Sequence, residues 1–409
     1  MRGLVAYRRP AAALAAVAAA ALLPPATCLA AAGSLDRSFD GNGRLVIKTA
    51  RGGMASAAGP DSELVAANYR RVFRYRANAR PRRYFAGNGR AVIPTPAGMS
   101  FLIAGVAVDS RGRVLVAGTR KPTGATGGSR NARVSVYRFM PNGKLDASFG
   151  KRGLAGAQLG QMEATGLVVD SRNRPVLTGF VSAPTPFFCN TKSSVYLNST
   201  VVARLTTSGA PDPSFGGGSG TFTDPLEDPR LPTLTANGKG IVYASNPEYS
   251  RCVGFEGYSG PVGAPVASIL SPSGSLALRF PVRPSGPNLP GLASGLNVTS
   301  LAVDRKDRIV MLMTAVESEG SGNLQLVRRL LPDGSPDPKF GEYFQPGLGL
   351  AWPPAPPPEG PGGWSWAVTT DRRNRVIVGG SLGGEGRFDA RAFMVGRLNA
   401  AGRAQTWFG

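Results

Sequence analysis

The chain has 409 residues, a formal charge of +22 and no histidine. The absence of imidazole removes the commonest general base and the commonest ligand of transition metals, which disfavours zinc, haem and Ser-His-Asp enzymes. Gly (55) and Pro (35) together make up about a fifth of the residues, which favours many turns and short strands over long helices.

The first 32 residues have the pattern of an export signal. The pattern consists of Arg2, Arg8 and Arg9, then the apolar run 11–23, then small residues suited to cleavage near Ala30 or Ala32. The apolar run is too short to span a bilayer, and no later segment is long enough. We therefore expect a mature chain without a transmembrane helix, secreted or associated with the cell envelope; the alternative is a buried helix of a cytosolic protein.

Cys28 raises the question of a lipid anchor. A lipobox usually has leucine three positions before its cysteine, and Pro25 stands there. This departure argues against a lipoprotein.

A motif that ends in phenylalanine recurs along the chain. Its clearest copies are "GSLDRSFDG" (33–41), "PNGKLDASFG" (141–150), "SGAPDPSFG" (208–216) and "DGSPDPKFG" (333–341), with weaker copies at 78–87, 273–280 and 401–409. The closing residues are Phe39, Phe85, Phe149, Phe215, Phe280, Phe340 and Phe408, which enclose six units of 60–68 residues apart from a first unit of 46. So many copies cannot each be a catalytic site, so we interpret the motif as a structural turn with its phenylalanine pinned between units.

Each unit also contains two apolar strands joined by a polar turn, as in "GVAVDSRGRVLVAGT" (105–119). The turns begin with an aspartate able to cap them: Asp109, Asp170, Asp304 and Asp371. A third strand precedes the phenylalanine motif, and a fourth follows it. The alternation of apolar and polar residues predicts four short strands in each unit.

These features predict an all-β fold, a β-propeller of six four-stranded blades in one domain spanning 33–409. Seven blades remain possible because both ends carry the motif. A β-solenoid is the alternative architecture, although its repeats are usually shorter. The strand residues expected in the core are Val106, Val108, Leu115, Val168, Leu177, Leu301, Val310, Val376 and Val378.

These residues resemble the delta-60 repeat family of bacterial secreted proteins. "RFMPNGKLDASFGKRG" (138–153) and "RLLPDGSPDPKFG" (329–341) match the second half of its repeat, and hairpins such as "DSRGRVLVAGT" match the first half. The resemblance covers essentially the whole mature chain and implies a propeller-like extracellular fold without a shared activity. The motif aspartate is missing at Arg82, Ala277 and Gln405, so we expect those blades to be less well capped.

An arginine stands eleven positions before the phenylalanine in five units. These residues are Arg74, Arg138, Arg204, Arg329 and Arg397, and Ile269 takes the place in the fourth unit. A repeated position indicates a structural role, in which the guanidinium pairs with the motif aspartate (Asp146, Asp212 or Asp337) or with strand carbonyls. The functional alternative is a ring of arginines that binds an anion in the channel.

The stretch "NYRRVFRYRANARPRRYF" (68–85) interleaves arginines with aromatic residues and has no acid. Such a pattern suits an anionic polymer. The candidate binding residues are Arg70, Arg71, Arg80, Arg82 and Arg83. The alternative is a solvated face, since the stretch aligns without gaps to 135–149.

Cys189 and Cys252 lie in long insertions of consecutive units, and we expect a disulfide between them in an oxidising compartment. The binding surface is expected on insertions that leave one face: 120–132, 182–198, 246–263 and 352–363.

Catalytic patterns are weak. Glu63, Glu163, Glu227, Glu248 and Glu256 do not occupy matching positions in their units, and we find no pair of acids at an interpretable spacing. We expect no cofactor and no metal. The sequence predicts a monomeric, exported, non-catalytic binding scaffold for an anionic wall polymer, glycan or nucleic acid. The alternatives are a propeller enzyme of hydrolase or lactonase type and a purely structural surface protein.

Overall fold

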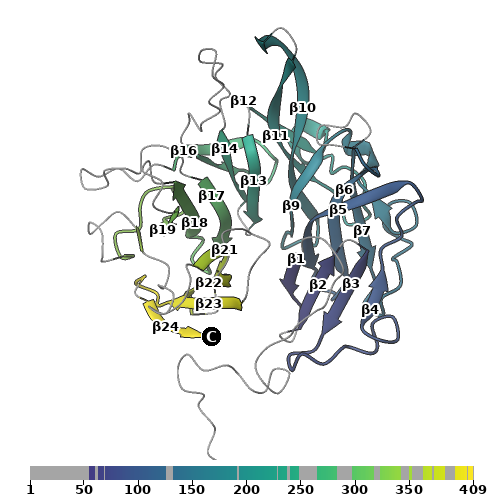
Figure 1. The fold of residues 1–409 in the computed structure, drawn as a ribbon, viewed down its shortest axis with the longest axis horizontal. Helices are drawn as coiled ribbons and strands as arrows, with labels where there is room; N and C mark the ends of the chain where they lie inside the picture. Colours follow the sequence, from purple (N-terminus) through teal and green to yellow (C-terminus); the bar gives the residue numbers. More distant parts are fainter. Residues whose placement is uncertain are drawn as a thin grey trace, which may run out of the picture.

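The computed structural model describes residues 55–59, 63–68, 70–125, 132–190, 193–227, 229–236, 240–247, 265–282, 297–316, 323–341, 350–351, 363–370, 373–382, 392–402 and 404–408. They form six four-stranded antiparallel sheets that follow one another around a common centre (Figure 1). The predicted class, an all-β propeller, is confirmed.

In every blade the strands pair in chain order. Blade 1 contains β1 (Ala55–Ala58), β2 (Leu64–Asn68), β3 (Arg71–Tyr75) and β4 (Arg90–Val92). Blade 2 contains β5 (Met99–Val108), β6 (Val114–Pro122), β7 (Arg133–Phe139) and β8 (Leu154–Ala155). Blade 3 contains β9 (Glu163–Val169), β10 (Pro175–Asn190), β11 (Ser193–Arg204) and β12 (Thr221–Glu227).

The second half of the chain repeats the pattern. Blade 4 contains β13 (Pro229–Ala236), β14 (Ile241–Pro247), β15 (Val266–Leu270) and β16 (Leu276–Pro281). Blade 5 contains β17 (Asn297–Val303), β18 (Ile309–Val316), β19 (Asn323–Leu330) and β20 (Leu350–Ala351). Blade 6 contains β21 (Gly363–Thr370), β22 (Val376–Leu382), β23 (Ala392–Leu398) and β24 (Ala404–Phe408). Two single turns of 3-10 helix lie between strands in the first half of the chain: η2 (Ala157–Leu159) after β8 and η3 (Gly216–Gly218) after β11.

The first strand of each blade packs beside the first strand of the next, from β1 through β5, β9, β13 and β17 to β21. These strands therefore line the centre of the arrangement. Among the described residues, β21 and β1 share no contact of similar extent, and blades 1 and 6 stand on opposite sides of the lower part of Figure 1.

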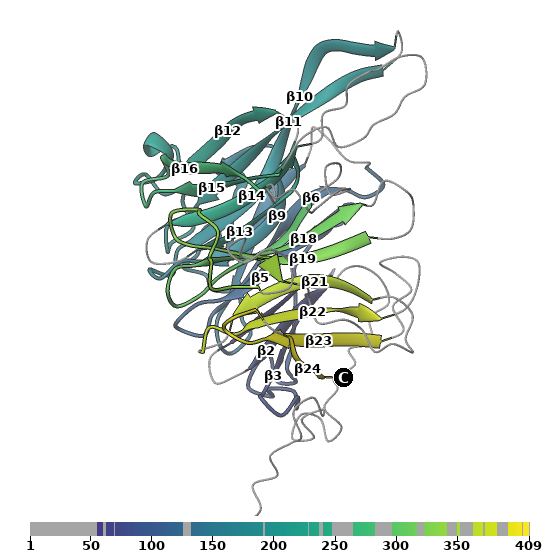
Figure 2. The ribbon, with the colours of Figure 1, turned by 90° about the vertical axis from the view of Figure 1, so that its left-hand side faces the viewer.

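Antiparallel pairing places the turns after the first and third strands at one end of each blade, which we call the turn face. The connections after the second and fourth strands lie at the opposite end, the loop face. One insertion expected there is not a loop, because 182–198 continues the ladder of β10 and β11 as far as the pair Asn190 and Ser193. This hairpin projects beyond the blades at the top of Figures 1 and 2.

The apolar core lies between neighbouring blades. Of the nine strand residues expected inside, Val108 and Val168 are half-buried. The other seven are at most 7% exposed: Val106, Leu115, Leu177, Leu301, Val310, Val376 and Val378.

The phenylalanine motif fastens each blade to the next. Phe149 is fully buried, and the amide after it, of Gly150, donates a hydrogen bond to the carbonyl of Ser208 in blade 3 at 2.7 Å. The same bond joins Ala86 to Asn142, Gly216 to Ser273 and Gly341 to Ala401. The turn glycine of each following blade packs against this site; a Cβ on Gly209 would lie 3.0 Å from the ring of Phe149. The motif is thus an inter-blade joint.

The joint between blades 4 and 5 is built differently. Pro281 follows Phe280 and has no N–H to donate. At the opposite end of this boundary the side chain of Asn246 donates to the carbonyl of Val298 at 3.0 Å and accepts from the amide of Val298 at 2.8 Å. A continuous apolar cluster of blade 4 and blade 5 residues surrounds these bonds.

Two weak copies of the motif are strands rather than turns. The copies at 273–280 and 401–409 largely form β16 and β24. Both lack the aspartate whose carboxylate accepts hydrogen bonds from the turn elsewhere, as Asp146 does from the amide of Ser148 at 3.1 Å. The copy with Arg82 keeps the turn, because the amide of Phe85 donates to the carbonyl of Arg82 at 2.8 Å.

Residues 1–54 lie outside the described residues, so the predicted export signal and Phe39 are not described. Within the part of the chain that is described, no helix has the length and apolar composition needed to cross a membrane.

We expect Gly209→Ala to destabilise the protein more than Gly217→Ala. Both glycines have positive φ (93° and 67°), so each substitution strains the backbone by about 1–2 kcal/mol. A Cβ on Gly209 would also lie 2.9 Å from the amide nitrogen of Gly150, whereas nothing lies within 4 Å of one on Gly217. The overpacking adds about 1–3 kcal/mol. Urea unfolding measures both, and equal losses would contradict the inter-blade role of this contact.

Candidate anion-binding site on blade 1

Blades 2, 3 and 5 each contain the same buried network of two arginines and two aspartates. In blade 3, the Nε of Arg204 lies 2.7 Å from the Oδ2 of Asp212. Arg174 lies 3.0 Å from the same oxygen and 2.7 Å from Asp170. The corresponding residues are Arg138, Asp146, Arg113 and Asp109 in blade 2, and Arg329, Asp337, Arg308 and Asp304 in blade 5. Charges are balanced within each network.

The network arginines also connect neighbouring blades. Arg204 donates from Nη1 to the carbonyl of Pro272 in blade 4 at 2.6 Å, and its guanidinium lies 4.5 Å from the ring centre of Phe215. Arg138 likewise donates to the carbonyl of Thr207 in blade 3. The side chains of Arg138, Arg204 and Arg329 are 1–2% exposed, which leaves no surface for a ligand. Arg397 lies in β23, and its side chain is outside the described residues.

Burial and ion pairing shift the pKa values of these side chains in opposite directions. Burial lowers the pKa of Arg204, and the nearby charge of Arg174 lowers it further. Burial alone would raise the pKa of Asp212, but hydrogen bonds from Ser214 and Arg204 outweigh it and hold this pKa below its usual value. The pKa values of Asp146 and Asp337 are lowered by the same balance.

Blade 1 contains this network with one pair reversed. Glu63 occupies the hairpin position of Arg113, because Gly59 and Glu63 close the turn as Asp109 and Arg113 do. Arg82 occupies the position of Asp146, because both bond the third strand and close the turn before the phenylalanine. The Oε1 of Glu63 lies 2.6 Å from Arg82, and its Oε2 lies 2.6 Å from Arg74.

The charge and the hydrogen bonding of this group differ from those of the other networks. Arg74 and Arg82 surround one carboxylate, and Gly59 stands where the other networks have a second aspartate, so the group carries +1 where the networks of blades 2, 3 and 5 are neutral. Glu63 is 3% exposed, and its Oε1 has no hydrogen-bond partner because its contact with Arg82 lacks hydrogen-bond geometry. Arg82 itself is 38% exposed.

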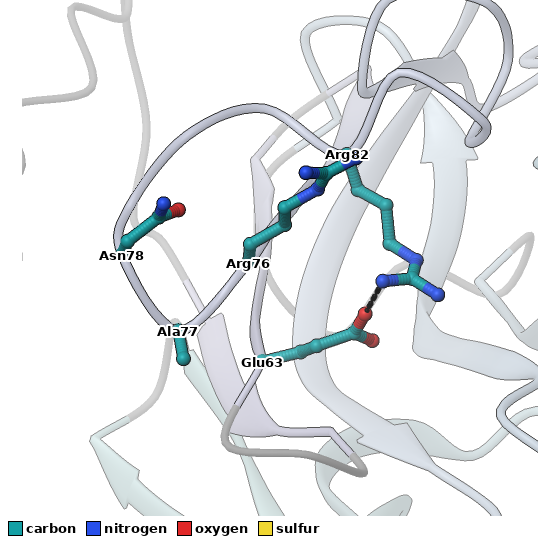
Figure 3. Close-up of a pocket in the computed structure, with 5 residues that line it drawn as sticks. All are labelled: Glu63, Arg76, Ala77, Asn78 and Arg82. Carbon is teal, nitrogen blue, oxygen red and sulfur yellow. Dashed lines mark ion pairs between the residues drawn. The ribbon is translucent and has the colours of Figure 1, made fainter.

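A pocket of about 410 Å³ opens beside this network, lined by Glu63, Arg76, Ala77, Asn78 and Arg82 (Figure 3). The lining loop is held by its own backbone, since the amide of Arg76 donates to the carbonyl of Arg80 at 2.9 Å. In Figure 3 the side chains of Arg76 and Arg82 border the loop, and the carboxylate of Glu63 faces the guanidinium of Arg82. The pocket thus offers two guanidinium groups and a carboxylate oxygen that lacks a hydrogen bond.

The structure divides the five candidate arginines between the two faces. Arg80, Arg82 and Arg83 lie in the turn after β3, on the turn face, whereas Arg70 precedes β3 and Arg71 is its first residue, at the loop face. Phe73, Tyr75 and Phe85 are buried, as blade positions should be. Tyr84, however, is 71% exposed in the same turn as the three arginines.

Arg76 and Glu63 were missed as site residues. Glu63 occupies a hairpin position at which blades 2, 3 and 5 have an arginine, so it matches no other glutamate. Aligning "GPDSE" (59–63) with "DSRGR" (109–113) reveals the exchange, together with Arg82 opposite Asp146.

The structure gives little evidence on the other sites considered from the sequence. The described residues contain no group of three or more His, Cys, Asp or Glu side chains placed to hold a metal ion. Cys189 lies in β10, and Cys252 is outside the described residues, so their disulfide stays a prediction. Most of 246–263 and 352–363 is also outside them.

Residues 112–149 match the Domain of unknown function (DUF5122) beta-propeller. They run from the first turn of blade 2 to its phenylalanine, which supports a β-propeller repeat. No curated protein matches the chain.

Solved structures with a similar fold include a gluconolactonase from Xanthomonas campestris (16% identity, 79% of this chain, 81% of that chain, TM-score 0.37). A putative gluconolactonase is also similar, with 12% identity, 79% of this chain and 83% of that chain covered, and a TM-score of 0.37. A polysaccharide lyase has 9% identity, 87% of this chain and 88% of that chain covered, and a TM-score of 0.40.

Exchanging the charges of Glu63 and Arg82 in one double variant should restore part of the stability that each single substitution removes. Glu63→Arg leaves three arginines together, and Arg82→Asp leaves two acids beside each other, so each should cost about 3–5 kcal/mol. The double variant E63R/R82D restores the arginine–aspartate pair of blade 2, although Gly59 supplies no equivalent of Asp109, and should recover at least about half of the summed loss. Urea unfolding of the four proteins tests this, and strictly additive losses would contradict the pairing.

The networks predict a loss of stability in acid. The pKa values of Asp146, Asp212 and Asp337 are lower in the folded protein than the unfolded value of about 3.9. Their contribution is therefore complete above about pH 4 and disappears as the pH falls through the folded pKa values. Urea unfolding between about pH 6 and pH 2 should show this decline, with a smaller decline in Asp212→Asn; an unchanged free energy at low pH would contradict it.

Proposed function

We propose that this protein is a non-catalytic β-propeller scaffold that binds an anionic polymer through the turn 76–84 of blade 1. One observation carries the proposal: this turn presents Arg76, Arg80, Arg82 and Arg83 beside an exposed Tyr84, whereas the equivalent turns of blades 2, 3 and 5 are built around a buried aspartate.

The charge around this turn supports the proposal. The sequence has no acidic residue between Glu63 and Asp109, and eight arginines lie in that interval. Glu63 is buried and already faces two of them, so the solvent-facing charge of the turn is positive. Basic groups clustered on one surface attract polyanions and release their counterions on binding.

The proposal includes an exported protein that acts at a bacterial envelope or outside the cell. The pattern of residues 1–32 and the resemblance to the delta-60 repeat support this location. The mature chain from 33 to 409 would act as one propeller domain and as a monomer. The anionic partner would be a wall polymer, a glycan or nucleic acid.

The test is retention of the mature protein on immobilised anionic polymer over a salt series. R76Q/R80Q/R83Q removes three exposed charges of the turn without touching the partner of Glu63. R111Q/R172Q/R305Q removes three exposed arginines from the hairpin turns of blades 2, 3 and 5, and is the matched control.

We expect the salt needed for elution to fall sharply for the blade 1 variant and only slightly for the control. The slope of log affinity against log salt should shrink by roughly 2–3, since each phosphate-like contact contributes about 0.7–0.9. Equal behaviour of the two variants would show that the polymer responds to net charge alone, and would overturn the proposed site.

A further inference from the structure

We infer that the pocket of blade 1 recognises a uronic acid residue of an acidic polysaccharide. The inference rests on the proposed function, because it names the ligand of the same turn. It depends on three features of the pocket, which are two guanidinium groups, a buried acceptor without a hydrogen bond, and a neighbouring exposed ring.

The guanidinium groups suit a carboxylate. Arg76 is exposed at the rim, and Arg82 is 38% exposed although one Nη lies 2.6 Å from Glu63. A guanidinium has five N–H donors in a planar fork that matches the two oxygens of a carboxylate. Arg82 can therefore hold Glu63 on one side and a ligand carboxylate on the other.

The carboxylate of Glu63 is an acceptor to which a ligand hydroxyl can donate a hydrogen bond. The side chain of Glu63 is only 3% exposed, and its Oε1 accepts no hydrogen bond. In blades 2, 3 and 5 the corresponding buried position holds an arginine, which needs acceptors instead. This oxygen lies 2.6 Å from a guanidinium nitrogen of Arg82, and a ligand hydroxyl that displaces this contact would donate to it. A sugar acid carries a carboxylate and neighbouring hydroxyl groups on one ring.

The size of the pocket and the nearby aromatic residue agree with a sugar ring. A volume of about 410 Å³ accommodates one or two pyranose rings, since pockets for small ligands begin near ~300 Å³. Tyr84 follows Arg82 and Arg83 in the same turn and is 71% exposed, so its ring is available to the apolar face of a neighbouring sugar.

Nucleic acid fits the same features less well. A phosphodiester backbone has charge but no donor for Glu63 when the sugar is deoxyribose. Proteins that hold single strands stack successive bases on several aromatic residues. Among the side chains whose exposure the structure describes, Tyr84 is the one strongly exposed aromatic residue.

The experiment is isothermal titration of the mature protein with oligogalacturonate of about six residues at physiological salt. Three comparison ligands separate the chemistry: methyl-esterified oligogalacturonate, linear polyphosphate of matched charge, and oligodeoxythymidylate of matched charge. R76Q removes one guanidinium of the pocket, and R172Q removes an equally exposed arginine from the turn face of blade 3.

We expect oligogalacturonate to bind at least about tenfold more tightly than each comparison ligand, because a charge-assisted hydrogen bond contributes about that factor. R76Q should weaken it about tenfold or more, and R172Q less than about twofold. E63R/R82D, which replaces the acceptor by a guanidinium, should abolish the preference over polyphosphate while remaining folded.

Two results would overturn the inference, and they differ in meaning. If uronate, phosphate and deoxythymidylate bind equally, or deoxythymidylate binds best, the pocket is not a uronate site, although the turn still binds polyanions. If none of them binds at physiological salt, the proposed function fails as well.

Discussion

The first three blades depend on a buried guanidinium that finds acceptors on both sides of an inter-blade boundary. Arg138 and Arg204 reach a carboxylate in their own blade and a carbonyl in the next one. An arginine left without either partner would be a costly buried charge. Each of these blades therefore needs its neighbour to complete the hydrogen bonding of its arginine.

Blade 1 shows how such a constraint can be met with opposite charges. Glu63 and Arg82 keep the contact that Arg113 and Asp146 make, but the cation now lies on the outer turn. The exchange places a guanidinium on the accessible turn, and Gly59 in place of a second aspartate leaves the group with a net positive charge. The proposed binding surface would arise from a structural position, without a new loop or a new fold.

The repeat made the strands and their order predictable, because apolar alternation and the phenylalanine spacing recur in every unit. The exchange at Glu63 was not predictable from positions judged one acid at a time, since its partner, Arg82, lies in a different turn. The extension of β10 and β11 was also missed. Its proline-rich sequence reads as a loop, but the ladder accommodates Pro184 next to a bulge.

Pro281 gives the propeller one joint without the backbone hydrogen bond that follows the phenylalanine in blades 1, 2, 3 and 5. Apolar clusters span the other described boundaries as well as the one between blades 4 and 5, so the difference lies in the joint and not in the core. Phe280 still packs against the turn glycine of the next blade, Gly334. The repeat can therefore lose the amide donor of a joint and keep the contact between ring and glycine.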